Sequence, residues 1–244
     1  MPILYRDDHI VAIHKPAGLL VHRSPIARQE TRFAVQQLRD QIGQPVWPAH
    51  RLDRGTSGLL LFALDADSLR RLNRQFEAGE VAKTYLAVVR GWPEESGVID
   101  HPLAPVHDPY APVANPEPQD AVTRYLRLAT AELPYRVDRY PSSRYALLAL
   151  EPLTGRRHQL RRHLKHIAHP IIGDATYGKG RHNRLFAELC GHERLWLACV
   201  EMAFRHPAEG SEMRLVAPLA CEFGDLLEKM GWTGAVPVHW SVRA

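Results

Sequence analysis

The sequence predicts an α+β fold, in which one domain is built on a mixed, largely antiparallel sheet flanked by helices. Short β-branched and apolar runs stand in hairpin-like pairs, and apolar residues recur at helical spacing over residues 31–42, 65–79 and 156–167. Strands and helices do not alternate regularly, so a parallel βαβ architecture is not indicated. At 244 residues and 45% hydrophobic content, the chain can bury a sizeable core.

The first ninety residues carry clear signals for individual elements. Strands are expected at residues 3–5, 10–13, 59–64 and 81–89, and the first two form a hairpin around a pair of aspartates. A helix over 31–42 should stop at Gly43. Asp65 or Asp67 should cap a second helix that ends at Gly79.

The middle of the chain is dense in proline, at positions 93, 102, 105, 109, 112, 116 and 118. Residues 92–119 are therefore expected to be a long loop or loosely folded arm, mobile without a partner. The arm is either a surface insertion without a function of its own or a segment that binds a partner molecule. Beyond it we expect strands at 121–125 and 144–150, a helix over 156–167, a strand and glycine turn over 169–178, and a last helix over 219–230.

Composition narrows the class of protein. The formal charge is +4 and the pI about 9.1, which leans toward nucleic acid. The three cysteines are odd in number and form no CxxC pair, so neither a disulfide framework nor a zinc ribbon is indicated. The amino-terminal residues do not resemble a secretory signal, and no apolar run approaches the length of a membrane span. A cytoplasmic protein is expected.

Residues 50–58 carry the strongest chemical signal. Asp53 stands between Arg51 and Arg54, just before the apolar run at 59–64. Two guanidinium groups this close favour the ionised carboxylate, and Gly55 and Gly58 allow a tight turn. Such a carboxylate suits a nucleophile or base that acts on an anionic polymer. The alternative is a surface loop in which the aspartate only balances its neighbouring arginines.

A metal-dependent nuclease is a second possibility, because histidines stand at 158, 163, 166 and 169. His163 and His166 are one helical turn apart, which suits a pair of ligands. No carboxylate or cysteine pattern accompanies them, and their neighbours are cationic, so we expect solvated or RNA-facing histidines and no metal. The sequence has no GxGxxG and no Walker loop, and we expect no cofactor.

The segment His-Arg-Leu-Asp-Arg-x-Thr-Ser-Gly at 50–58 resembles the signature of the RluA-type pseudouridine synthases at every defined position. Further segments resemble the family's other motifs: Lys-x-Tyr at 83–85, Thr-Gly-Arg-x-His-Gln-Leu-Arg at 154–161 and Arg-Leu-x-Leu at 194–197. The resemblance covers nearly the whole chain. It fails at Ala198 and Cys199, where the family usually has histidine and alanine, so position 198 receives no role.

The resemblance implies one pseudouridine synthase catalytic domain over residues 1–244, without a separate S4-type RNA-binding module. It implies a cofactor-free isomerase with Asp53 as the catalytic aspartate, Tyr85 against the target base and Arg161 paired with Asp53. Arg51 would fill the space that the flipped base leaves. The remaining substrate-binding residues implied by the motifs are His50, Lys83, Arg156, Arg157 and Leu197, of which the arginines would meet phosphates and Leu197 would line the uracil pocket.

The resemblance further implies a substrate: a uridine in tRNA, at position 65 in the stem below the T loop. The alternatives are a uridine in rRNA, or an RNA-binding relative that has lost activity. Whether Asp53 attacks the ribose C1′, attacks C6 of the base or removes the 2′ proton stays open at the sequence level, although the family favours the 2′-proton route. We expect a monomer that does not associate with membranes.

Overall fold

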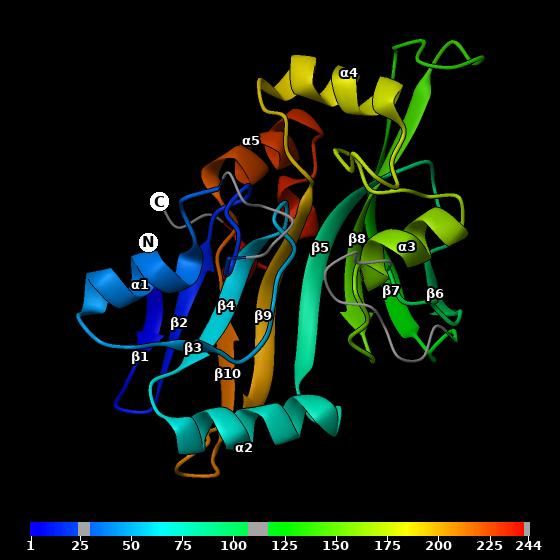
Figure 1. Cartoon of the computed structure of the whole chain (residues 1–244). Helices are drawn as coiled ribbons and strands as arrows, with labels where there is room; N and C mark the ends of the chain where they lie inside the picture. Colours follow the sequence, from blue (N-terminus) through cyan, green and yellow to red (C-terminus); the bar gives the residue numbers. More distant parts are fainter. Residues whose placement is uncertain (24–29, 107–116, 242–244) are drawn as a thin grey trace.

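A single ten-stranded sheet runs through the computed structural model, which describes residues 1–23, 30–106 and 117–241 (Figure 1). Its strands are β1 (Ile3–Arg6), β2 (Ile10–Lys15), β3 (Trp47–Pro48), β4 (Ser57–Ala63), β5 (Ala82–Arg90), β6 (Ser96–Asp100), β7 (Val122–Leu133), β8 (Ser143–Pro152), β9 (Leu197–Arg205) and β10 (Glu212–Val216). The helices are α1 (Ala34–Ile42), α2 (Ala66–Glu77), α3 (Gln159–His166), α4 (Gly180–Cys190) and α5 (Cys221–Lys229), followed by the 3-10 turns η2 (Thr233–Ala235) and η3 (Val238–Trp240).

The strands follow the order β1-β2-β4-β9-β5-β8-β7-β6, with β10 beside β9 and β3 beside β4. Neighbouring strands of the described chain pair antiparallel except β4 and β9, which run parallel where Ser57 faces Ala198 and Gly58 faces Cys199. The predicted α+β fold with a mixed, largely antiparallel sheet is therefore confirmed.

The parallel junction depends on a glycine. Gly58 has φ +101°, and a Cβ built there would lie 2.0 Å from the carbonyl oxygen of Cys199. Only glycine lets the two backbones approach this closely. The junction brings the loop before β4, which contains Asp53, beside the start of β9, which contains Leu197.

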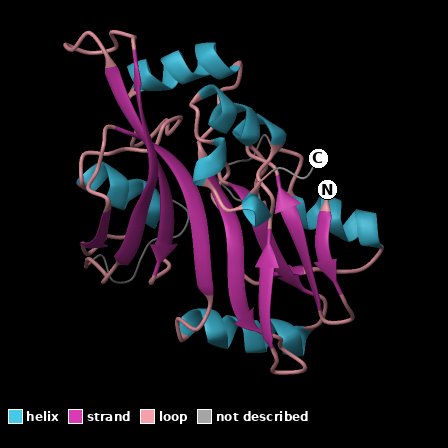
Figure 2. Cartoon of the chain, turned by 180° about the vertical axis from the view of Figure 1, so that it is seen from behind, coloured by secondary structure: helices cyan, strands magenta, loops and turns pink. Residues whose placement is uncertain are grey.

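Buried side chains form a separate core on each face of the sheet, and Figures 1 and 2 show the molecule from opposite sides. Buried side chains of α1, α2 and α3 pack on one face, and those of α4, α5 and the 3-10 turns pack on the other. The strand period of two is visible in β5, where Ala87 and Val89 belong to the first core and Leu86 and Val88 to the second. The sheet is thus covered on both sides.

Most of the predicted elements are present. The first hairpin, the buried strand after residue 56, the strand after Gly79 and the last helix all form close to the expected positions. Gly43 ends α1 in the left-handed conformation at φ 73°, and Asp65 caps α2 by accepting a hydrogen bond from the Ser68 amide. Both caps could be predicted from residue type, because each depends only on the conformation and hydrogen bonds of neighbouring residues.

Other local predictions were wrong. The arm at 92–119 contains the edge strand β6, because the stretch between Pro93 and Pro102 has no proline to prevent pairing with β7. The strand expected within 169–178 is instead a series of turns, apart from one bridge between Ile171 and Val89. Helix α3 starts at Gln159 rather than at residue 156, and α4 was not predicted. The expected mobility of the arm falls partly on residues 107–116, which lie outside the described residues.

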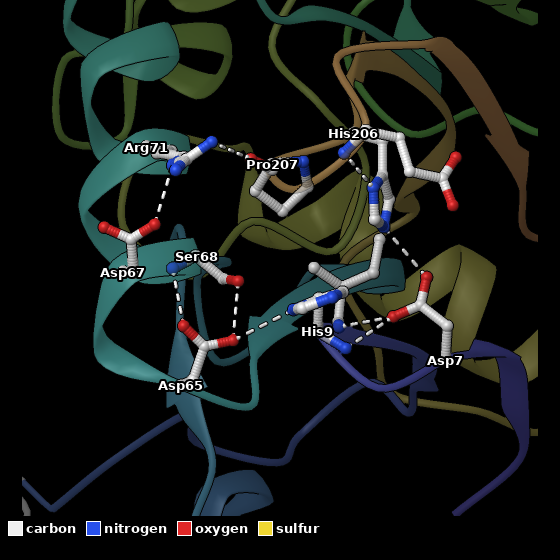
Figure 3. A network of polar contacts seen from close by, with 10 residues as sticks. Asp7, His9, Asp65, Asp67, Ser68, Arg71, His206 and Pro207 are labelled. Atoms are coloured by element: carbon white, nitrogen blue, oxygen red, sulfur yellow. Dashed lines mark hydrogen bonds and ion pairs between the residues drawn. The ribbon is translucent and has the colours of Figure 1, made fainter.

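A polar network joins three segments at the end of the sheet beside α2 (Figure 3). His206, after β9, lies 2.9 Å from Asp7 in the first hairpin, while His9 of the same hairpin lies 3.3 Å from Asp65 at the start of α2. Arg71 of α2 donates to the carbonyl oxygen of Pro207. These contacts fix α2 against two hairpins that are distant in sequence.

No helix among the described residues is both long and apolar enough to cross a membrane.

Candidate active site

A cleft of about 1490 Å³ opens on the face of the sheet that carries Asp53. Its walls come from the loop before β4, the start of β5, the segment that leads into α3, and the segment between α4 and β9. The lining includes all the residues predicted for catalysis and substrate binding, namely Asp53, Tyr85, Arg161, His50, Arg51, Lys83, Arg156, Arg157 and Leu197. Side chains spread over 148 positions, from residue 50 to residue 197, thus meet in one cavity.

The loop that carries Asp53 is tied down by a buried lysine. Lys15 is fully buried, and its ammonium donates to the carbonyl oxygens of Pro16, Leu19 and Arg54 at 2.9, 2.8 and 3.2 Å. Burial lowers the pKa of Lys15 to about 7, and the charge of Asp53 opposes that shift. The ammonium of Lys15 therefore joins the first hairpin to Arg54, the residue that follows Asp53.

Arg161 forms a bridge between two carboxylates. Its Nη1 donates to Oδ2 of Asp53 at 2.9 Å, while Nε and Nη2 donate to the two oxygens of Asp174 at 2.7 and 2.9 Å. The Asp174 side chain is fully buried, whereas 27% of the Asp53 side chain is exposed toward the cleft. A bidentate contact on one side fixes the plane of the guanidinium and so directs Nη1 at Asp53.

Asp174 was not predicted as part of the site, because the sequence indicated only a strand and glycine turn over residues 169–178. Its Oδ1 also accepts hydrogen bonds from the amides of Thr176 and Tyr177, both at 2.9 Å. Burial raises the pKa of Asp174, but the Arg161 hydrogen bond and the Tyr177 amide outweigh it, and the pKa is lowered. For Arg161, burial is likewise outweighed by Asp174 and Asp53, so its pKa is raised. Asp174 and Arg161 are therefore both held in their charged forms.

His158 is a further neighbour of Asp53, which the sequence predicted to be a solvated or RNA-facing histidine and did not place beside the aspartate. It precedes α3 in the left-handed conformation at φ 57°, and its Nε2 lies 3.8 Å from Oδ1 of Asp53. Its Nδ1 is 3.0 Å from the hydroxyl of Tyr177. Burial lowers the pKa of His158, and Asp53 opposes this. A non-glycine residue at positive φ is uncommon, and here it directs the ring at the carboxylate.

Tyr85 and Lys83 lie on the wall formed by β5. Tyr85 is 8% exposed, and it pairs in register with Cys199 of β9. Burial, followed by the charge of Cys199, raises the pKa of Tyr85 well above its usual range, so the phenol stays protonated. Lys83 is half-buried and its Nζ lies 5.6 Å from the centre of the Phe76 ring; burial lowers its pKa.

His50 is held by the backbone of the sheet. Its Nε2 accepts a hydrogen bond from the Leu61 amide at 3.1 Å, and its ring stacks on Phe76 with centroids 5.3 Å apart. Burial, followed by the charge of Lys83, lowers the pKa of His50 to about 3. The imidazole is therefore neutral, and its position against β4 fixes where the following residue, Arg51, leaves the sheet.

The arginines predicted to contact the RNA stand at the rim of the cleft. Arg51, Arg156 and Arg157 are exposed, and Nε of Arg156 donates to the Asp120 carbonyl at 3.0 Å. Arg156 and Arg157 precede α3 instead of forming its first turn, which corrects the expectation that the helix itself would present them. Arg162, inside α3, donates to the carbonyl of Ala104.

Arg194 supports the other end of the Asp53 loop and was not given a role from the sequence. Its side chain is 5% exposed, and it contacts Glu222 of α5 at 2.5 Å and the hydroxyl of Ser57 at 2.7 Å. The guanidinium also lies 5.1 Å from the centre of the Trp196 ring. Ser57 begins β4, so Arg194 joins this strand to α5.

The described residues contain no group of three or more His, Cys, Asp or Glu side chains arranged to hold a metal ion. Of the four histidines considered for a metal, His163 lies 3.0 Å from the Thr123 hydroxyl, and His166 stacks on His101 with ring centroids 3.7 Å apart. Their ring positions are accounted for by contacts within the fold.

This arrangement of a cleft-facing aspartate, a bridging arginine and a buried tyrosine agrees with a match of residues 9–166 to the model of the RNA pseudouridylate synthase family. The chain belongs to the RNA pseudouridylate synthase family, and pseudouridine synthases are isomerases.

Individual relatives match along nearly the whole chain. A protein of Vibrio vulnificus named tRNA pseudouridine synthase C is 46% identical over 95% of this chain and 96% of its own length. The protein of the same name from Haemophilus ducreyi is 49% identical, with the same coverage of both chains. Among solved structures, human RNA pseudouridylate synthase domain containing 4 superposes with a TM-score of 0.68 at 29% identity, covering 94% of this chain and 93% of its own.

Proposed function

We propose that this protein converts a uridine of tRNA to pseudouridine, and that its target is uridine 65. The support for tRNA is the near-full-length similarity to proteins named tRNA pseudouridine synthase C. The proposed position follows from the family resemblance of the motifs around residues 50–58 and 154–161. The same domain would supply its own RNA contacts, and it would act as a monomer.

One observation carries the catalytic part of the proposal. Asp53 is held by a single hydrogen bond from Arg161, while the opposite side of that guanidinium is fixed by the buried Asp174. Oδ1 of Asp53 accordingly remains available at the floor of a cleft large enough for a nucleotide. A carboxylate that is oriented and only partly exposed is suited to act as nucleophile or base.

The reaction rearranges bonds without redox change. The N1–C1′ glycosidic bond breaks, the base turns, a C5–C1′ bond forms, the proton on C5 is lost and N1 gains a proton. In the route we favour, Asp53 takes the 2′ proton of the ribose after the base has separated, and returns it when the new bond forms. Tyr85, neutral because burial raises its pKa, lies against the base and donates its hydroxyl proton rather than accepting one.

A base inside a stem must leave the helix before Asp53 can reach its ribose. Unpairing and unstacking cost a few kcal/mol, which contacts with the RNA must recover. We assign this to Arg51, which is exposed at the rim and can fill the vacated space, and to Arg156 and Arg157, which can contact phosphates. His50 and Lys83 shape the wall beside Tyr85, and Leu197 offers an apolar surface to the uracil ring.

The direct test incubates the purified protein with an unmodified tRNA transcript and, separately, with rRNA fragments, and maps pseudouridine at single-nucleotide resolution. We expect pseudouridine at position 65 of the tRNA and none in the rRNA. Modification of an rRNA fragment with every tRNA transcript left unmodified would refute the tRNA assignment. Modification of tRNA at another position would refute only the choice of uridine 65.

A further inference from the structure

The hairpin of β7 and β8 projects beyond the rest of the sheet. Pairing of β8 with β5 ends at Tyr145 and Arg90, whereas β7 and β8 stay paired up to Leu133 and Ser143. The connecting residues 134–142, here called the outer loop, lie past the end of β5 and next to α4, as both views show (Figures 1 and 2). The outer loop takes no part in lining the cleft.

The outer loop is rich in exposed cations and aromatic rings. Arg136 and Arg139 are exposed, and the Tyr135 and Tyr140 side chains are 43% and 59% exposed. The guanidinium of Arg139 lies 4.7 Å from the centre of the Tyr140 ring and donates to its hydroxyl at 2.6 Å. An arginine stacked on an exposed tyrosine presents positive charge and a flat ring together, which suits a phosphate backbone and an unpaired base.

The outer loop is held rigidly, although a two-stranded hairpin alone is only marginally stable. The buried His182 of α4 contacts the Tyr145 hydroxyl at 2.8 Å on one side and Asp138 of the outer loop at 3.1 Å on the other. At the base of the hairpin, the Arg144 guanidinium lies 4.3 Å from the Trp92 ring centre. These contacts hold Asp138, whose side chain is 43% exposed, against α4, and the two arginines of the outer loop face solvent.

Helix α4 extends this positive surface to the cleft. Lys179, Arg181 and Arg184 are exposed along it, and Arg184 also lines the cleft. The acidic groups that face this surface include Glu188 of α4, which is exposed, and Glu132, which accepts from the Ser142 hydroxyl and pairs with Arg144. Asp138 also faces it, and its pKa is lowered first by His182 and to a smaller extent by Arg90 and Arg181. Neither Arg136 nor Arg184 has an ion-pair partner among the described residues. Positive charge therefore continues from the catalytic cleft to the outer loop.

We propose that the outer loop and the exposed side of α4 form a second RNA-docking surface, which binds the backbone of the same folded RNA outside the cleft. Arg136, Arg139, Arg181 and Arg184 contact phosphates there, and Tyr140 offers a ring on which an unpaired base stacks. This inference rests on the proposed function, because it requires an RNA whose target uridine enters the cleft. It also explains how a single domain can grip a folded RNA rather than a short strand.

The test compares two charge-matched double variants in RNA binding at several salt concentrations. Arg136→Ala with Arg139→Ala removes the two arginines of the outer loop. Arg6→Ala with Arg39→Ala removes two exposed arginines near β1 and α1, at the opposite side of the molecule in Figure 1. Each is measured with a full-length tRNA transcript and with a short stem-loop that carries only the target uridine and its flanking pairs.

With full-length tRNA, the outer-loop variant should lower the slope of log K against log salt by about two units, one for each lost phosphate contact. The control variant should keep the slope of the unsubstituted protein, and the short stem-loop should not distinguish the variants. Tyr140→Ala should weaken tRNA binding at high salt as well, since stacking is not screened.

If the outer-loop variant binds full-length tRNA with the same salt dependence as the control variant, the proposal that this surface binds RNA is refuted. The exposed arginines and tyrosines would then fit a protein partner instead. Failure of the unsubstituted protein to form pseudouridine while it binds tRNA with the expected salt dependence would refute the proposed reaction instead. Binding and chemistry are read separately, so the two failures are distinguishable.

Discussion

At the scale of single residues, the site depends on two carboxylates that contact the same guanidinium of Arg161 in different ways. Asp174 is buried and receives two hydrogen bonds from the guanidinium, whereas Asp53 receives one and keeps an oxygen toward the cleft. The sequence resemblance led to the pair of Asp53 and Arg161, which stand 108 positions apart. It could not reveal Asp174 as the anchor, because its role depends on a turn that brings residue 174 under α3.

Replacement of Arg161 by alanine should destabilise the fold as well as abolish activity. The substitution leaves the buried Asp174 carboxylate without its bidentate partner, which costs on the order of 3–5 kcal/mol. Arg162→Ala is the matched control, because this half-buried neighbour donates, among the described residues, to the Ala104 carbonyl, a contact worth about 1 kcal/mol. Chemical denaturation of both variants measures the difference. Equal free energies of unfolding would show that Arg161 is not the structural bridge described here.

At the scale of elements, the sequence was informative wherever the determinant was local. Gly43 predicts where α1 stops, Asp65 predicts where α2 starts, and the apolar run after residue 56 predicts β4. The start of α3 was misplaced because the left-handed His158 delays the helix, and no residue type signals that conformation for a histidine. Helix α4 was missed because its buried residues, His182 and Phe186, are few and one of them is polar.

The cap of α2 gives a pH-dependent prediction. Asp65 accepts hydrogen bonds from the amide and hydroxyl of Ser68, which lower its pKa to about 2. A lowered carboxyl pKa contributes stability that is present above the unfolded value of 3.8 and is lost as pH falls toward 2. Asp65→Ala should therefore cost about 1 kcal/mol at pH 7 and much less at pH 2.

Asp67→Ala is the control for this cap, because Asp67 stands in the same first turn but pairs, within the described part of the chain, with the surface residues Arg70 and Arg71. Figure 3 shows its contact with Arg71. It should cost about 0.5 kcal/mol or less. Urea denaturation of both variants at pH 7 and at low pH provides the comparison. A deficit of Asp65→Ala that stayed constant with pH would contradict the cap as the source of its stability.

At the scale of the whole molecule, two halves of the sheet meet at the parallel contact of β4 with β9. The half with β1, β2 and β4 supplies Asp53, and the half with β5, β8 and β9 supplies Tyr85 and Leu197. The sequence predicted a mixed sheet, but it did not predict that β4 would pair with β9, whose facing residues Ser57 and Ala198 are 141 positions apart. Such an order of strands is set by packing between distant segments and not by local periodicity. The cleft is a product of that long-range pairing.

Gly58→Ala should therefore damage the whole molecule. It places a Cβ against the Cys199 carbonyl at a backbone φ of +101°, and should cost more than about 4 kcal/mol or prevent folding. Gly43→Ala is the matched control: its φ is +73° but no atom lies within 4 Å of the added carbon, so only the backbone penalty of about 1–2 kcal/mol remains. Thermal and chemical unfolding compare the two, and similar losses would contradict the close approach of β4 and β9.

The central claim is that the Asp53 carboxylate performs the chemistry while other residues bind the RNA. The most direct measurement is single-turnover pseudouridine formation by Asp53→Asn, together with its affinity for the same tRNA transcript. Asp40→Asn serves as the control, since that carboxylate is exposed on α1 and its ion-pair partner among the residues that the structure describes is Arg39. We expect Asp53→Asn to bind tRNA as the unsubstituted protein does and to lose at least about 10³-fold in rate, or 4 kcal/mol of transition-state stabilisation. Retention of more than a few per cent of the rate would contradict the account.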